Sequence, residues 1–116
     1  EAIPNLRVLV AGGGEERFLA QYRKHSPHVQ VLGPVPFVEM RSLFVQADLA
    51  LVPSVWHENS PVTIFESYQM GTPVAGSSIG GIPEFIRDGE TGYLFETGNA
   101  RALADVICRH FSRSAY

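Results

Sequence analysis

The 116-residue sequence lacks the features of membrane-spanning, disulfide-rich and disordered proteins. No apolar run approaches the roughly 18 residues that a membrane-spanning helix needs. The single cysteine, Cys108, cannot form a disulfide within the chain, so a reducing, cytoplasmic compartment is expected. With 45% hydrophobic and 18% charged residues, the composition is that of a globular protein with one core.

Basic charge is also scarce and scattered. Nine Lys and Arg residues stand against twelve Asp and Glu residues, which gives a formal net charge of −3. A domain that binds nucleic acid usually carries a basic stripe that neutralises phosphates. The sequence therefore predicts no nucleic-acid partner.

The apolar residues occur in short runs that alternate with segments of helical spacing. Strands are predicted at Leu6–Val10, Val29–Leu32, Leu49–Val52, Pro73–Ala75 and Tyr93–Phe95. Helices are predicted at Glu15–His25, Val38–Gln46, Pro61–Met70, Pro83–Arg87 and Ala100–Phe111. Consecutive apolar positions favour buried strands, and parallel neighbours need a crossover that can hold a helix. We therefore predict a single α/β domain over residues 1–116, with a Rossmann-like parallel β-sheet flanked by helices.

A glycine run follows the first predicted strand and superficially suggests a dinucleotide site. The fingerprint that begins at Gly12 would require Gly or Ala at position 17, where the chain has Arg17. No Asp or Glu closes the second predicted strand to hold a ribose. We interpret Gly12–Gly14 as a tight turn near a ligand rather than as a dinucleotide site.

The loop Pro53–Pro61 leads into a predicted helix through a capping pattern. Ser60 is a favoured N-cap residue, and Pro61 is a favoured first helical residue. The free N–H groups at such a helix start suit a phosphate. The alternative is a capped helix without a ligand.

Glu66 lies in the same predicted helix among mostly apolar and aromatic neighbours. An ionised carboxylate only accepts hydrogen bonds, and it can hold both vicinal hydroxyls of a ribose. The alternative is an exposed helix carboxylate.

Glu58 and Glu66 are separated by seven residues, with the helix start between them. Together with the motifs around it, this pair resembles the E-x7-E signature of retaining glycosyltransferases of the large family 4 type, the glycosyl transferases group 1. The other motifs that carry the resemblance are Pro53–Ser54, Gly71–Ala75, Gly80–Phe95, Val31–Val35 and Ala47–Asp48. The resemblance covers about residues 4 to 110 and implies the C-terminal half of a GT-B enzyme.

The resemblance implies a role for each matching position. Glu66 would accept the ribose hydroxyls, and Glu58 would act as the catalytic residue near the donor sugar and its distal phosphate. The remaining positions implied to contact the nucleotide sugar are Asn59, Ser60, Val62 and Thr63 through backbone N–H groups, Gly33 and Val35 beside the base, and Gly80 and Gly81 in a closely approaching loop.

The resemblance also implies parts that this sequence does not contain. Family members carry a G-R strand and a following Lys that balance the diphosphate charge, and an N-terminal domain that holds the acceptor. We expect that this chain is N-terminally truncated, and that the strand Leu6–Ala11 has an exposed edge or gap. We also expect weak donor binding and no transfer by the isolated chain.

The predicted function is donor binding in a retaining glycosyltransferase that transfers a sugar from a nucleoside-diphosphate sugar to a sugar, lipid-linked or other acceptor. The chain has no D-x-D motif, so neither a metal nor another cofactor is predicted. The full-length protein is expected in the cytoplasm, or at the cytoplasmic face of the membrane. The alternatives are a nucleotide-sugar epimerase of similar architecture, which would turn over without an acceptor, and a non-catalytic nucleotide-sugar-binding module.

Overall fold

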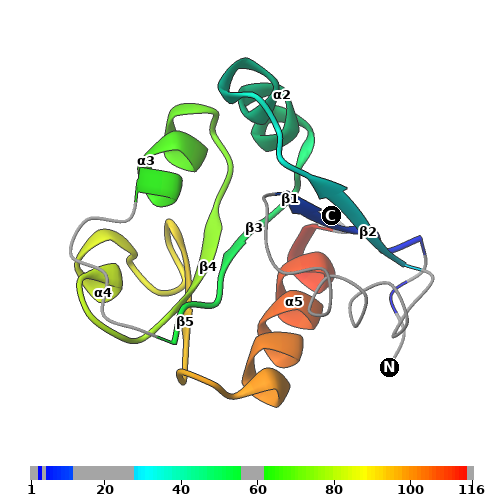
Figure 1. Ribbon diagram of the computed structural model, residues 1–116. Helices are drawn as coiled ribbons and strands as arrows, with labels where there is room; N and C mark the ends of the chain where they lie inside the picture. The colour runs from blue at the N-terminus through cyan, green and yellow to red at the C-terminus, as the bar shows by residue number, and fades with distance from the viewer. Residues whose placement is uncertain (1–2, 4, 12–27, 56–61, 115–116) are drawn as a thin grey trace. The chain divides into compact units, whose positions relative to one another are not determined.

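The computed structural model describes residues 3, 5–11, 28–55 and 62–114 of the chain. It divides the chain into two compact units, Glu1–Met40 and Arg41–Tyr116, called the first and second unit below. The elements follow the order β1 (Val8–Ala11), β2 (Val29–Gly33), α2 (Phe37–Gln46), β3 (Ala50–Val52), α3 (Val62–Gln69), β4 (Val74–Ser77), α4 (Ile82–Phe85), β5 (Gly92–Phe95) and α5 (Ala100–Ser114) (Figure 1).

The first unit holds a parallel pair of strands. β1 and β2 pair with Val8 opposite Val29, and the register shifts between Val10 and Ala11. The Arg7 guanidinium also donates a hydrogen bond to Gln30 Oε1 at 3.1 Å. Among the described strands β1 has β2 as its only neighbour, and the exposed edge of the first strand stays a prediction. The predicted Gly12–Gly14 turn and the predicted helix Glu15–His25 lie outside the described residues.

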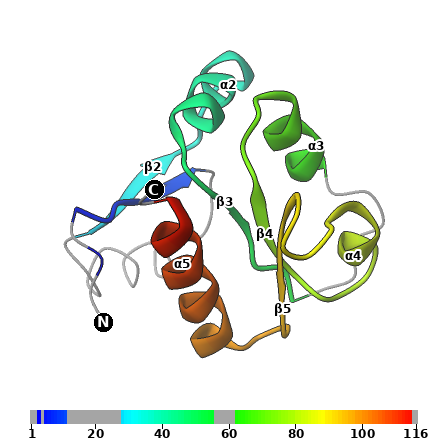
Figure 2. The same ribbon diagram turned by 180° about the vertical axis from the view of Figure 1, so that it is seen from behind.

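The second unit is a layered α/β structure. Its strands have the order β3-β4-β5, and both pairings are parallel, with Ala50 opposite Val74 and Val74 opposite Gly92. Figure 1 and the reverse view in Figure 2 show α3 and α4 on one face of this sheet and α5 on the other. The predicted parallel α/β fold is confirmed, and its described strands form two sheets, β1-β2 and β3-β4-β5.

On the α5 face, large side chains of the sheet pack against the helix. Tyr93, Phe95 and Val106 are buried around Ala75 of β4. Leu49, Leu51, Ala102 and Leu103 pack around this cluster. The helix begins with a capping bond, because the Ala102 N–H donates to Asn99 Oδ1 at 2.9 Å. A long helix is thus fixed by its apolar stripe and by its first turn.

On the α3–α4 face, helix side chains pack onto a glycine of β4. Ile64 and Ile82 are fully buried, and Ile86 is 4% exposed. A Cβ on Gly76 would lie 2.7 Å from Ile86 Cδ1 and 2.8 Å from Ile82 Cγ2. Because such contacts are too short, these isoleucines can pack this closely on the strand only where residue 76 has no side chain.

The observed helices follow the predictions with shifted ends. α4 covers Ile82–Phe85 rather than Pro83–Arg87, because Ile86 adopts an extended conformation with φ −121° and ψ 124°. This turn of the chain buries Ile86. α5 continues to Ser114, three residues beyond the predicted end at Phe111. No helix in the described part of the chain has the length and apolar character needed to cross a membrane.

Candidate functional site

The carboxyl ends of β3 and β4 lie at one edge of the second unit's sheet, since the two strands are parallel neighbours. In open α/β sheets, ligands bind at this edge. The loop after β3 leads into α3, and the loop after β4 leads into α4. The predicted nucleotide-sugar residues of the second unit belong to these two connections and to the helix starts that follow them.

α3 presents three predicted residues on one side. Val62, Thr63 and Glu66 are spaced at positions i, i+1 and i+4, so they share a side of the helix that faces away from the fully buried Ile64. Val62 and Thr63 are exposed, and Glu66 is half-buried. The first turn of the helix has backbone N–H groups without a partner inside the helix, as every helix start does, and their contact with a phosphate stays a prediction.

The Glu66 carboxylate has no hydrogen bond or ion pair with any residue in ranges 28–55 and 62–114. By contrast, the neighbouring Ser67 is fully buried, and its hydroxyl donates to the Thr72 carbonyl at 2.8 Å. The helix is therefore anchored by residues other than Glu66. The carboxylate keeps its capacity to accept hydrogen bonds from a ligand.

The Gly80–Gly81 turn connects β4 to α4. Gly80 has a positive φ of 58°, which favours glycine, and Gly81 is a buried residue at the N-cap of α4. The turn is tight, because the Ile82 N–H donates to the Ile79 carbonyl at 3.2 Å. Backbone conformation thus explains Gly80, and its contact with a ligand stays a prediction.

The other predicted site residues belong to the first unit or lie outside the described residues. Gly33 ends β2 with a φ of 73°, and the half-buried Val35 follows it, both in the first unit. Glu58, Asn59 and Ser60 lie outside the described residues. The roles of all five stay predictions.

A hydrogen-bonded connection between α3 and the α4–β5 turn was not predicted from the sequence. The Tyr68 hydroxyl donates to the Phe85 carbonyl at 3.0 Å and lies 3.1 Å from Thr91 Oγ1. Thr91 Oγ1 accepts a hydrogen bond from the Arg87 N–H at 2.9 Å. No local signal reveals such bonds, because Tyr68 is 17 and 23 residues away from its partners.

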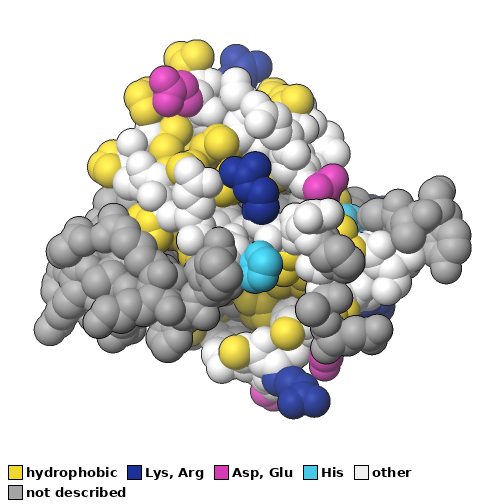
Figure 3. Space-filling model, turned by 90° about the vertical axis from the view of Figure 1, so that its right-hand side faces the viewer, with side chains coloured by type: hydrophobic (Ala, Val, Ile, Leu, Met, Phe, Trp, Pro, Cys, Tyr) yellow, Lys and Arg dark blue, Asp and Glu magenta, His cyan; other side chains and the backbone are white. Residues whose placement is uncertain are grey.

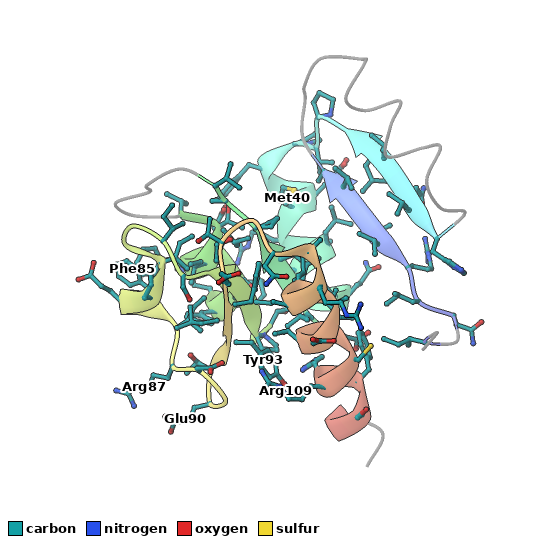
Figure 4. All side chains as sticks on the ribbon, turned by 90° about the horizontal axis from the view of Figure 1, so that it is seen from below. Met40, Phe85, Arg87, Glu90, Tyr93 and Arg109 are labelled. Carbon is teal, nitrogen blue, oxygen red and sulfur yellow. The ribbon has the colours of Figure 1, made fainter. Side chains whose placement is uncertain are left out.

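The face of the molecule seen in Figure 3 carries its basic side chains singly. Figure 3 shows Lys and Arg side chains as separate groups rather than as one patch. Figure 4 shows Arg87 and Glu90 extending away from the sheet at the α4–β5 turn. Within residues 28–55 and 62–114, no group of three or more His, Cys, Asp or Glu side chains could hold a metal ion. Whether the protein uses a metal stays a matter of prediction.

Comparison with known families decides the assignment. A family model described as glycosyl transferases group 1 matches residues 1–113. The chain belongs to this family. The predicted family is confirmed.

Two curated glycosyltransferases are similar to this chain along most of its length. A phosphatidyl-myo-inositol mannosyltransferase of Mycobacterium leprae is 30% identical over 108 residues, which cover 92% of this chain and 29% of the relative. A D-inositol 3-phosphate glycosyltransferase of Mycobacterium tuberculosis is 35% identical over 115 residues, covering 90% of this chain and 24% of the relative. The chain thus spans 29% and 24% of the length of these two glycosyltransferases.

Solved structures support the GT-B fold. HepE from Anabaena, in complex with UDP and glucose, has a TM-score of 0.87 and 22% identity, covering 98% of this chain and 33% of that chain. The sucrose-phosphate synthase of Thermosynechococcus elongatus has a TM-score of 0.81 and 27% identity, covering 94% of this chain and 30% of that chain. The predicted Rossmann-like fold of this family member is therefore confirmed.

Proposed function

We propose that this chain is the donor-binding domain of a retaining glycosyltransferase that uses a nucleoside-diphosphate sugar. The observation that carries the proposal is the family match, which spans residues 1–113. The place of the predicted residues at the carboxyl edge of a parallel sheet supports it.

In this proposal α3 holds the nucleotide. The half-buried Glu66 accepts the two ribose hydroxyls, and the backbone N–H groups near Val62 and Thr63 receive phosphate or sugar oxygens. A helix start contributes roughly 0.3 to 1 kcal/mol of favourable interaction with an anion. The same group of contacts would include Asn59 and Ser60 before the helix and the Gly80–Gly81 turn beyond it, while Gly33 and Val35 flank the base.

In the proposed reaction the bond between the sugar and the diphosphate oxygen breaks, the acceptor hydroxyl oxygen bonds to the same face of the sugar, and the proton of that hydroxyl passes to the departing diphosphate. Glu58 lies near the donor sugar, where an oxocarbenium-like transition state develops. The leaving diphosphate is stabilised by the start of α3 and by an Arg and a Lys from outside this sequence, an electrostatic role that assigns no step to a metal.

The proposed partners follow from the same chemistry. The donor is a nucleoside-diphosphate sugar, in agreement with the UDP-glucose complex of HepE. The acceptor is a sugar, a lipid-linked sugar or another hydroxyl compound, held by a domain that this sequence does not contain. We propose a cytoplasmic location, and no transfer by the chain alone, because transfer needs both reactants in one closed cleft.

A thermal-shift panel tests the proposal on the full-length protein. The ligands are UDP, GDP, ADP and their sugars, each at about a hundredfold excess over a trial Kd. A true donor should raise the free energy of unfolding by roughly 2.7 kcal/mol at that excess. If none of the nucleotides or nucleotide sugars stabilised the protein, the proposal would be contradicted. Turnover of a nucleotide sugar without an acceptor would favour an epimerase instead.

A further inference from the structure

We infer that Tyr68 is a positioning residue. It fixes the position of α3 relative to the Gly80–Gly81 turn, so that both can contact the nucleotide-sugar donor. The inference rests on the proposed function, and it adds a residue that has no role in the predicted site. It starts from the contacts between α3 and α4.

α3 is too short to fix its own orientation. It has eight residues, about two turns, and its buried side chains are Ile64 and Ser67. Helices of this length depend on tertiary contacts for their stability. The further tertiary contacts of α3, in addition to those of Ile64 and Ser67, therefore help to set the orientation of the helix start.

Two residues of α3 hold the same residue of α4. Phe65 and Tyr68, spaced three positions apart, lie on one side of α3. The Phe65 ring contacts the Phe85 ring edge to face, with centroids 4.8 Å apart and an interplanar angle of 74°. The Tyr68 hydroxyl bonds the Phe85 carbonyl. Phe85 is thus held at its ring and at its backbone.

The hydrogen bonds around Tyr68 run in one direction. The Phe85 carbonyl can only accept, so the Tyr68 hydroxyl donates its proton there. Thr91 must then donate to the Tyr68 oxygen, while its own oxygen accepts from the Arg87 N–H. Each hydroxyl donates once and accepts once, and bonds in such a chain strengthen one another.

This chain of bonds links the two parts of the proposed donor site. Phe85 is four residues after Gly81, and Ile82 between them is fully buried against the sheet. Glu66 is two residues before Tyr68 in the same helix. Loosening the Phe85 contact would let α3 shift relative to the Gly80–Gly81 turn, and a shift of about 1 Å can impair a binding site strongly.

The test is Tyr68→Phe in the full-length protein, which keeps the ring and removes both hydroxyl bonds. We expect Kd for UDP-glucose and KM for the donor to rise about three- to tenfold, with kcat changed less than twofold. A rise in KM with kcat nearly unchanged is expected when the lost interaction stabilised the ground state and the transition state equally. A merely structural role would lower the active fraction, and hence kcat, while KM stayed constant.

Tyr93→Phe is the matched control. It removes a tyrosine hydroxyl that lies 2.9 Å from His110 Nδ1 on the α5 face, so it should lower Tm without changing KM. Thr91→Val removes only one of the two Tyr68 hydroxyl bonds and should raise Kd and KM by a smaller factor, whereas Thr91→Ser, which keeps the hydroxyl, should leave them unchanged. Hydrogen exchange should quicken in residues 62–69 and 82–91 of Tyr68→Phe.

Two results would overturn the inference: a Tyr68→Phe protein with Kd, KM and exchange rates within twofold of the wild type, or an equal rise in KM for Tyr93→Phe. Failure of the proposed function has a different outcome. In that case the wild-type protein itself binds none of UDP-glucose, GDP, ADP and UDP. Tyr68 then has no nucleotide-sugar site to position.

Discussion

The two faces of the β3-β4-β5 sheet are held by different kinds of interaction. The α5 face has a fifteen-residue helix packed on large buried side chains such as Tyr93 and Phe95. The α3–α4 face has helices of eight and four residues that meet at Phe85, with Ile82 of α4 and the following Ile86 packed on Gly76. Among the described residues of the second unit, the proposed donor residues Val62, Thr63, Glu66, Gly80 and Gly81 belong to the elements of the second face or to the turn before α4. The face with the smaller helices is thus the one that would meet the ligand, as ligand-binding segments are often the less stable parts of a fold.

Polar contacts on the α5 face join elements that are already packed. His110 Nε2 lies 3.0 Å from the Asp48 carbonyl, and His110 Nδ1 lies 2.9 Å from the Tyr93 hydroxyl. Since the carbonyl only accepts, Nε2 carries the proton and Nδ1 accepts from Tyr93. The Arg109 guanidinium lies 5.2 Å from the centre of the Tyr93 ring, a cation–π contact that Figure 4 locates beside α5. These contacts add to a hydrophobic core instead of replacing it.

Gly92→Ala should abolish the difference between the faces by disrupting the sheet that both share. A Cβ at this position would lie 2.0 Å from the Val74 carbonyl oxygen, so β5 cannot keep its pairing with β4. We expect a loss of at least about 3 kcal/mol in the free energy of unfolding, measured by urea denaturation.

Gly98→Ala is the control for this substitution. Gly98 has a φ of 74°, but a Cβ there would meet no atom within 4 Å. It should cost about 1 to 2 kcal/mol for the backbone conformation alone. Equal losses for the two variants would show that the contact with Val74 does not matter.

Glu66→Ala should affect ligand binding on the α3–α4 face and leave the fold intact. A carboxylate that accepts two ribose hydroxyls loses both bonds, each worth about 1.5 to 3 kcal/mol, so nucleoside-diphosphate affinity should fall by at least about a hundredfold. Glu58→Ala should mainly lower kcat. Titration calorimetry and steady-state kinetics on the full-length protein measure both effects.

Glu90→Ala provides the matched control, because this exposed glutamate extends away from the sheet (Figure 4). Its diphosphate affinity should equal that of the wild type. If Glu66→Ala also binds the diphosphate as tightly as the wild type, the ribose assignment is wrong.

Gly76→Ala should weaken the α3–α4 face alone. The new methyl group would clash with Ile82 and Ile86, and the free energy of unfolding should fall by about 1 to 3 kcal/mol. Ile86→Val removes Cδ1, the nearest atom at 2.7 Å, and should recover part of this loss in the double variant. Strictly additive losses in a double-mutant cycle would argue against this packing.

Asn99→Ala should have the smallest effect, restricted to the start of α5. It removes the side-chain bond to the Ala102 N–H and should cost about 1 kcal/mol in the free energy of unfolding. Asn99→Asp keeps an acceptor and should retain most of the stability. Nucleotide affinity should stay constant in both variants, and a marked change in it would mean that the two faces are coupled.

Much of the fold follows from local patterns. Apolar runs and helical spacing located every described strand and helix, although their ends differ by up to three residues. These patterns work because burial on a sheet or along a helix imposes a regular spacing. The end of α4 was missed because Ile86 leaves the helix in order to become buried, a choice made by tertiary packing.

The site divides in a similar way. The pair Glu58 and Glu66 and the motif Gly80–Phe95 pointed to the glycosyl transferases group 1, since spaced motifs in one order carry the family signal. The side of α3 that bears Glu66 followed from helical geometry once Ile64 was known to be buried. The connection from Tyr68 to Phe85 and Thr91 had no pattern that could have indicated it.

The sequence by itself determined the parallel α/β class, the order of the elements and the family, because each depends on residues close together in the chain or on fixed motif spacing. Only the tertiary structure decided that Gly76 seats α4, that Tyr68 joins α3 to the α4–β5 turn, and that Tyr93 meets His110. Each of these contacts joins residues 6 to 23 positions apart. Such pairs meet only after the strands have paired and the helices have packed, so their geometry is set by the packed core rather than by local sequence.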